Sequence, residues 1–134
     1  MAKRTERGWA AHFCSSSDCL FRRNTLLEHE GKHIVVSTVG AAIDPLRKGS
    51  RTHKFMFVEI ALGKHFDTAA FIGKDDGRYI DADTSQQIYF DAPCFIEELD
   101  ADDRANDMHE AVVKELMEKM EIPDNIFWLK IGVL

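Results

Sequence analysis

The chain is poor in cysteine and proline, with three of each among 134 residues. An odd number of cysteines is not typical of a secreted protein stabilised by paired disulfides, so the sequence predicts a reducing, cytoplasmic setting. No stretch approaches the roughly 20 consecutive apolar residues of a membrane-spanning helix, and no membrane partner is expected. The charged N-terminus, MAKRTERGW, lacks the apolar segment of a secretory signal.

Several catalytic signatures are missing as well. The chain contains no G-x-S-x-G nucleophile elbow, no C-x-x-C pair, and no Walker or G-x-G-x-x-G phosphate loop. Three cysteines and six histidines permit many pairings of a nucleophile with a base, but none of these pairings follows a recognisable spacing. We therefore expect a protein that is not an enzyme and that needs no cofactor, unless it holds zinc.

Charge of the two signs is divided unequally along the chain. Residues 1–67 carry 11 lysines and arginines against 7 acidic residues, a net charge of +4, whereas residues 68–134 carry 6 against 16, a net charge of −10; together they give −6. An acidic protein lacks the net positive potential that nucleic-acid binding needs, so a nucleic-acid partner is disfavoured. The basic half retains two local concentrations of positive charge, at Arg22-Arg23 and at Arg47–Lys54.

Hydrophobic residues make up 45% of the chain, which is enough for an ordinary core. At this length the core is that of a single domain, which we expect to span residues 1–134, with residues 1–7 as a mobile tail. No internal repeat or low-complexity tract divides the sequence.

The stretch richest in β-branched residues is His33–Val39 (HIVVSTV), which predicts a strand because branched Cβ atoms suit a pleated surface. Its run Ile34–Val36 is continuously apolar, which is typical of a central strand covered on both faces. Thr25–Leu27 predicts the strand before it, and Gly31 supplies the positive φ of a tight turn between the two. The sequence therefore predicts a β-hairpin at Thr25–Ile43.

The middle of the chain predicts further antiparallel strands. Lys54–Leu62 and His65–Ile72 flank the turn residues Gly63-Lys64 and predict a second hairpin. Trp9–Phe13 predicts a first strand, and Arg78–Phe90 predicts one further strand or two short ones.

Beyond residue 100 the apolar period changes from that of a strand to that of a helix. Apolar residues recur at spacings of three and four on one helix face: Ala101, Ala105, Met108, Val112, Leu116 and Met120. Asp100 or Asp102 can cap the start of this helix, and Pro123 ends it. The apolar segment Ile126–Leu134 is expected to form a strand or a packed tail.

These elements predict an α+β fold: a curved, mostly antiparallel sheet of about five to seven strands built from hairpins, with one long amphipathic C-terminal helix packed on it. A small sheet has edges to protect, and pairing the edges of two copies is a common solution, so a homo-oligomer is a further expectation.

Four residues approach the spacing of a zinc finger: Cys14, Cys19, His29 and His33. Zinc binds two cysteines and two histidines in a tetrahedron, so these residues are a candidate metal site. A finger requires a helix over Thr25–His33, however, where the sequence predicts a hairpin, and the gap between cysteine and histidine is about three residues shorter than usual. The alternative is two buried or half-buried cysteines and two surface histidines that flank a turn.

A small nucleotide that bears phosphate is a second candidate ligand. Guanidinium groups, an amide and hydroxyls suit an anion, and the basic half of the chain supplies them at Arg22, Arg23, Asn24, Ser37, Thr38, Arg47, Lys48 and Arg51. The alternative is that the arginines are solvated residues before a strand and that the hydroxyls belong to ordinary strand residues.

A third candidate site is the acidic run EELDADDRAND. Its carboxylates suit a basic protein partner: Glu97, Glu98, Asp100, Asp102, Asp103 and Asp107. The alternative is a solvated loop followed by the start of the helix.

Several short segments resemble bacteriophage-encoded hypothetical, or accessory, proteins. Such proteins often show a strand like Phe66–Phe71 (FDTAAF), then an acidic stretch like Asp81–Asp83, then a helix like Ala105–Val113 (ANDMHEAVV). Cys19–Thr25 and Val35–Gly40 are similar to phage segments too. The resemblance implies a viral accessory protein that acts in the host cytoplasm, often by inhibiting or sequestering a component or signal of host defence, and it assigns no catalytic residues.

The leading hypothesis is therefore a non-catalytic accessory protein that binds a host protein and inhibits or sequesters it. The two alternatives are a sponge for a small phosphate-bearing nucleotide signal and a small zinc-binding module.

Overall fold

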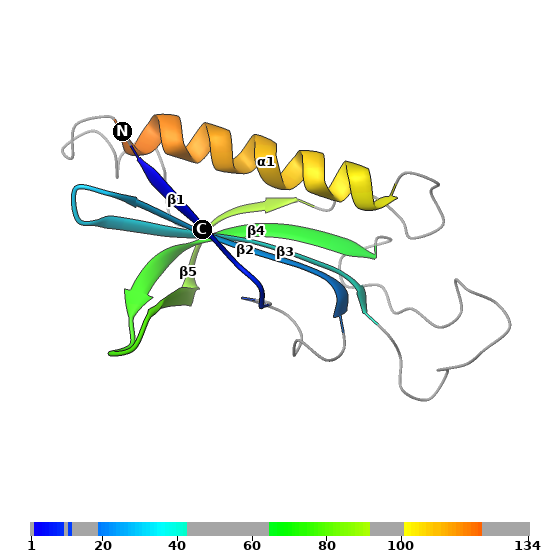
Figure 1. Cartoon of the computed structure of the whole chain (residues 1–134), viewed down its shortest axis with the longest axis horizontal. Coiled ribbons are helices and arrows are strands. Elements are labelled where there is room, and N and C mark those ends of the chain that lie inside the picture. Colours follow the sequence, from blue (N-terminus) through cyan, green and yellow to red (C-terminus); the bar gives the residue numbers. More distant parts are fainter. Residues whose placement is uncertain (1, 10, 12–18, 43–64, 92–100, 122–134) are drawn as a thin grey trace, which may run out of the picture.

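The computed structural model describes residues 2–9, 11, 19–42, 65–91 and 101–121. Within them lie five strands followed by one helix: β1 (Lys3–Arg7), β2 (Cys19–His29), β3 (Lys32–Ala42), β4 (Phe66–Asp75), β5 (Ile80–Asp91) and α1 (Ala101–Met120). The strands form one antiparallel sheet in chain order, and α1 lies along one face of it (Figure 1). The predicted α+β fold is confirmed.

β3 is the central strand of this sheet, as its continuous apolar run predicts. It pairs with β2 on one side and with β4 on the other. Ile34, Val35 and Val36 are all fully buried, so both faces of the strand are covered. The predicted hairpin is confirmed, and its strands are longer than the sequence indicated.

A two-residue turn, Glu30-Gly31, joins β2 to β3. Both residues have positive φ, 48° for Glu30 and 79° for Gly31, as a type I′ turn requires. Glycine adopts this conformation without steric cost, whereas glutamate does not. The turn sets the register of the hairpin, in which His29 lies opposite Lys32.

Lys3–Arg7 forms β1, so the prediction of a mobile tail over residues 1–7 is wrong. These residues pair with Asn24–Glu28 at the edge of the described sheet. Their sequence, KRTER, is charged enough to indicate a tail, but charged side chains are also what protects an edge strand from unwanted pairing.

The second predicted hairpin includes Lys54–Leu62, which lies outside the described residues. Its other predicted strand, His65–Ile72, corresponds largely to β4, which pairs with β3 along one edge and, from Thr68 onward, with β5 along the other. The region Arg78–Phe90 contains one strand, β5, whose pairing shifts register around Phe71. Three predicted segments lie wholly or mostly outside the described residues: Trp9–Phe13, Lys54–Leu62 and Ile126–Leu134.

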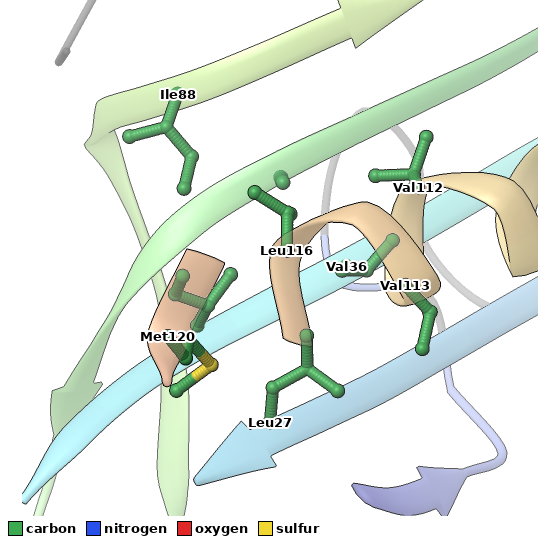
Figure 2. Close-up of a cluster of buried hydrophobic side chains, with 9 residues drawn as sticks. Leu27, Val36, Ile88, Val112, Val113, Leu116 and Met120 are labelled. Atoms are coloured by element: carbon green, nitrogen blue, oxygen red, sulfur yellow. The ribbon is translucent and has the colours of Figure 1, made fainter. Parts of the chain in front are cut away.

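The core lies between α1 and the sheet, and Figure 2 shows α1 side chains directed onto the strands. The cluster draws on the helix and on four strands: Leu27, Ile34, Val36, Ala70, Ile88, Val112, Val113, Leu116 and Met120. Burying a side chain of this size contributes about 1.5–3 kcal/mol. The apolar helix face predicted from the sequence is confirmed, since Ala105, Val112, Leu116 and Met120 are all buried.

Toward the other end of the hairpin, Phe21, Gly40 and Phe66 lie side by side on β2, β3 and β4. The rings of Phe21 and Phe66 meet edge to face, with centroids 5.6 Å apart. The Phe66 ring occupies the space where a Cβ atom on Gly40 would lie. Gly40 is therefore required by close packing between neighbouring strands.

Candidate functional site

A network of polar side chains crosses the interface between α1 and the sheet. His109 on α1 is fully buried. Its Nε2 lies 2.8 Å from Thr25 Oγ1 and its Nδ1 lies 2.8 Å from Thr38 Oγ1. Thr38 Oγ1 in turn lies 2.9 Å from Thr68 Oγ1. The imidazole therefore connects α1 to β2 and β3 directly, and to β4 through Thr38.

The direction of each hydrogen bond follows from Glu6 at the end of this network. The Thr25 hydroxyl donates to Glu6 Oε2, 2.6 Å away, because an ionised carboxylate can only accept. Thr25 must then accept from the Nε2–H of His109, which assigns the tautomer and leaves Nδ1 to accept from Thr38. The Thr38 oxygen accepts from Thr68. One chain of donors thus runs from Thr68 to Glu6, and we call these five residues the histidine network.

Glu6 also belongs to a ring of four charges at the margin between β1 and α1. Arg23 donates to both oxygens of Glu6, at 2.9 and 3.0 Å. Arg4 donates to Glu110 at 2.9 Å and lies 3.5 Å from Glu6. Arg23 and Glu110 are 3.7 Å apart, so each arginine faces both glutamates. We call Arg4, Glu6, Arg23 and Glu110 the charge ring.

These surroundings shift the pKa values of His109 and Glu6. Burial lowers the pKa of His109 to about 4, and the positive charge of Arg23 acts in the same direction. Desolvation alone would raise the pKa of Glu6, but hydrogen bonds from Arg23 and Thr25 outweigh it, and the pKa is lowered. At neutral pH the ring of His109 is uncharged. With both nitrogens occupied inside the protein, it holds the structure together and is not placed to act on a substrate.

A second feature lies beyond the end of β1. Trp9 and Tyr79 pack edge to face with ring centroids 5.7 Å apart, and the guanidinium of Arg7 lies 5.0 Å from the centre of the Trp9 ring. Arg7 also donates to Asn24 Oδ1, at 3.1 and 2.9 Å, and to the carbonyl of Ile80. Trp9 and Tyr79 are each 40% exposed, so this pair forms part of the surface. We call it the Trp9–Tyr79 pair.

A tight turn between β4 and β5 holds Tyr79 in place. Asp76 Oδ1 accepts from the backbone N–H groups of Arg78 and Tyr79, at 3.1 and 3.2 Å. The Asp76 N–H donates to the Tyr79 carbonyl at 3.2 Å, and Gly77 adopts a φ of 98° that other residues rarely take. The backbone bonds to the Asp76 carboxylate lower its pKa. The turn therefore fixes the backbone at Tyr79, and the ring of Tyr79 rests against Trp9.

The structure does not gather the predicted phosphate-binding residues into one site. Successive residues of a strand point to opposite faces of the sheet. Arg23 and Thr38 lie on the face toward α1, within the charge ring and the histidine network. Asn24 and Ser37 are buried on the opposite face, and Arg22 is exposed. The remaining residues of the set lie outside the described residues: Arg47, Lys48 and Arg51.

The predicted zinc ligands do not come together either. Cys19 lies opposite Ala42, whereas His29 lies opposite Lys32 at the other end of the hairpin. At a strand rise of about 3.3 Å per residue, Cys19 and His29 are about 30 Å apart, whereas zinc–ligand bonds are about 2 Å long. His29 and His33 also project from opposite faces of the hairpin. These residues cannot share one zinc ion, and the remaining ligand, Cys14, lies outside the described residues.

Cys19 is disulfide-bonded, and the cysteine to which it is bonded lies outside the described residues. A sulfur in a disulfide is no longer a thiolate ligand for zinc. Stable disulfides are typical of oxidising compartments, so this bond weighs against the reducing setting that the cysteine count predicts. Within the described ranges, no group of three histidine, cysteine or acidic side chains is placed to hold a metal ion.

The β2–β3 turn also contains a metal-binding signature that does not form a metal site. The segment His29–His33 (HEGKH) follows the pattern H-E-x-x-H, which binds zinc when both histidines lie on one face of a helix. Here the segment is a β-turn between two strands, so its histidines diverge. The same four-residue spacing that aligns side chains on a helix separates them across this hairpin.

The predicted acidic surface is only partly described. Asp102, Asp103 and Asp107 are exposed in the first two turns of α1. Glu97, Glu98 and Asp100 lie outside the described residues.

The sequence does not predict the roles of His109, Glu6, Trp9 or Tyr79. A signal for His109 is present, because it falls between Ala105 and Val112 on the apolar face of the helix, where its ring nitrogens need partners. No comparable signal marks Glu6 or Trp9, since both positions depend on the pairing of β1 with β2.

Comparison with protein-family models, with curated proteins and with solved structures finds no match to this chain. The only described helix, α1, is too polar to cross a membrane.

Proposed function

We propose that the protein is a non-catalytic accessory protein that binds a partner protein, and inhibits or sequesters it, through the Trp9–Tyr79 pair. The observation that carries this proposal is an exposed aromatic pair held in place by Arg7 and by the turn at Asp76. Tryptophan, tyrosine and arginine are enriched among the residues that dominate the energy of protein interfaces. Rings that are already fixed lose little conformational entropy on binding.

A small nucleotide is the second candidate ligand, and the geometry of the pair supports it less well. A base stacks on an open ring face or between parallel rings. Arg7 covers one face of Trp9, and the Tyr79 ring stands at 65° to it, so no slot between parallel rings is formed. The predicted phosphate-binding residues are also divided between the two faces of the sheet.

The exposed carboxylates of α1 would add a long-range electrostatic attraction for the partner. Asp102, Asp103 and Asp107 would draw in a basic partner and raise its association rate, which is the usual effect of charges at the rim of an interface. The resemblance to phage accessory proteins suggests a host protein in the cytoplasm as the partner. Cytosolic thiols would there be reduced, so binding is expected to persist when the disulfide at Cys19 is reduced.

The test compares the wild-type protein with the double variant Trp9→Ala/Tyr79→Ala as immobilised baits for bacterial lysate, with and without a thiol reductant. The control variant Glu115→Ala/Lys119→Ala removes an exposed ion pair on α1 instead. We expect one protein to be retained by the wild type and the control in both conditions, and to be lost from the aromatic variant while its circular dichroism is unchanged. Equal retention by all three would contradict the proposal.

Native mass spectrometry of the same proteins separates the alternatives. An added mass the size of a nucleotide on the wild type, lost from the aromatic variant, would favour the sponge. A dimer that dissociates only in the aromatic variant would show that the pair binds a second copy of the chain instead of a host protein.

A further inference from the structure

Helix α1 is held on the sheet by two kinds of contact. Its C-terminal half contributes apolar residues to the core, from Val112 to Met120. Its N-terminal half contributes His109, whose two ring nitrogens each contact a threonine of the sheet. The second kind of contact depends on the protonation state of the ring.

The hydrogen bonds around His109 suit a neutral imidazole only. Nε2 donates to Thr25, and Nδ1 accepts from Thr38. A protonated ring donates from both nitrogens, so the Thr38 hydroxyl would have to turn away and donate toward Thr68. The bond between the two threonines would then reverse, and the proton of Thr68 would need a new acceptor in a buried position.

The charged groups that face the ring do not compensate a further positive charge. β1 presents Arg4 and Glu6, β2 presents Arg23, and α1 itself presents Glu110. These form the charge ring, in which two arginines already balance two glutamates. From β3 and β4 the network presents only hydroxyl groups, those of Thr38 and Thr68. An imidazolium at this position would be a buried charge with no carboxylate of its own.

We propose that α1 is an acid-sensitive latch, and that protonation of His109 releases the helix from the sheet while the β2–β3 hairpin stays paired. This inference goes beyond the proposed function, since it concerns a different part of the molecule from the Trp9–Tyr79 pair. Release of the helix exposes the ring to water. Water then hydrates the positive charge and accepts hydrogen bonds from both N–H groups of the imidazolium. The hairpin keeps its own ladder of backbone hydrogen bonds, which does not involve the ring.

The sign and size of the effect follow from the two states of the ring. The pKa of His109 is about 4 when α1 is docked and returns to its ordinary 6.5 when the ring is hydrated. The free energy that keeps α1 docked is therefore greatest above pH 6.5, and it decreases as the pH falls toward 4. Between pH 8 and pH 5 these pKa values correspond to an increase of about 30-fold in the equilibrium constant for helix opening.

Hydrogen exchange of the full chain at pH 8 and pH 5 tests this proposal. Exchange is followed by mass spectrometry, with rates corrected for the intrinsic effect of pH, on peptides of α1 and of the hairpin. We expect protection of α1 to fall by about 30-fold at pH 5, with a much smaller change in the hairpin. Equal loss in both segments would mean global unfolding and would overturn the proposal.

Two variants assign the effect to one ring. His109→Gln keeps a donor and an acceptor but does not titrate, so its α1 protection should not change between the two pH values. His33→Gln alters a histidine that faces Glu28 away from α1, and it should behave as the wild type does. A loss of α1 protection in His109→Gln as large as in the wild type would contradict the latch.

If His109→Gln does not fold, the wild type alone decides. Nitrogen chemical shifts of the imidazoles, followed by NMR from pH 8 to pH 4, report the protonation of each histidine. We expect the His109 ring to remain neutral, in the Nε2–H tautomer, at pH 5 in those molecules in which α1 is docked. A His109 ring that titrates near 6.5 without any change in α1 would overturn the proposal.

Discussion

Among the described glycines, Gly40 has the least room for a side chain, because the Phe66 ring lies where its Cβ would be. We expect Gly40→Ala to displace this ring and to lower the free energy of unfolding by about 1–3 kcal/mol, as overpacking of a core does. Urea denaturation followed by circular dichroism measures the change. Gly8→Ala is the matched control, since nothing lies within 4 Å of a Cβ at Gly8. Equal stability of the two variants would contradict the role of the ring.

Thr38 links two parts of the histidine network, since its hydroxyl contacts both His109 and Thr68. Thr38→Val keeps the shape but removes the hydroxyl, leaving the Nδ1 of His109 buried without a donor. We expect a loss of about 1–3 kcal/mol in the free energy of unfolding, the cost of an unmet buried hydrogen bond. Thr38→Ser retains the hydroxyl, and chemical denaturation should show it to be the more stable variant. The reverse order would indicate that shape matters here and the hydrogen bond does not.

At the scale of elements, the hairpin turn contains a residue that does not favour its conformation. Glu30 has a φ of 48° at the first position of a type I′ turn, where asparagine is preferred. We therefore expect Glu30→Asn to stabilise the protein by about 0.5–1 kcal/mol, seen as a higher midpoint of thermal unfolding. Gly31→Ala, at a φ of 79°, should have the opposite effect. A destabilising Glu30→Asn would show that the glutamate side chain contributes more than its backbone strain costs.

β1 and α1 are joined by the charge ring, which a charge exchange can test. Arg4→Glu and Glu110→Arg each place like charges together, and we expect each to cost about 0.5–1 kcal/mol of stability. The double variant restores opposite charges and should recover part of this loss, as a double-mutant cycle in urea would show. The coupling should shrink in 1 M salt, because these side chains are partly exposed. Additive effects would mean that the pair contributes nothing.

In the whole molecule, the uneven distribution of charge along the sequence brings oppositely charged side chains of the two halves into contact. The arginines of the basic N-terminal half, on β1 and β2, meet a glutamate of the acidic C-terminal half, on α1. The sequence shows both concentrations of charge but does not show that they meet. The same holds for His109, which is separated from Thr25 by 84 residues and from Thr38 by 71.

The sequence by itself determined the elements whose signals are local. Branched side chains on both faces of His33–Val39 indicate a central strand, a glycine with positive φ indicates the turn before it, and a three-to-four period beyond residue 100 indicates one buried helix face. Each of these properties follows from neighbours within a few residues. The structure therefore agrees with all three.

Only the tertiary structure decided which elements pair beyond the β2–β3 hairpin and which polar groups meet. The charged segment Lys3–Arg7 forms a strand because it pairs with the edge of β2. The position of β4 in the sheet follows from its pairing with β3 on one side and with β5 on the other. The histidine network and the Trp9–Tyr79 pair depend on those pairings. Their members are distant in sequence, so no local period or motif records the contacts between them, and the free energy of those contacts arises only on folding.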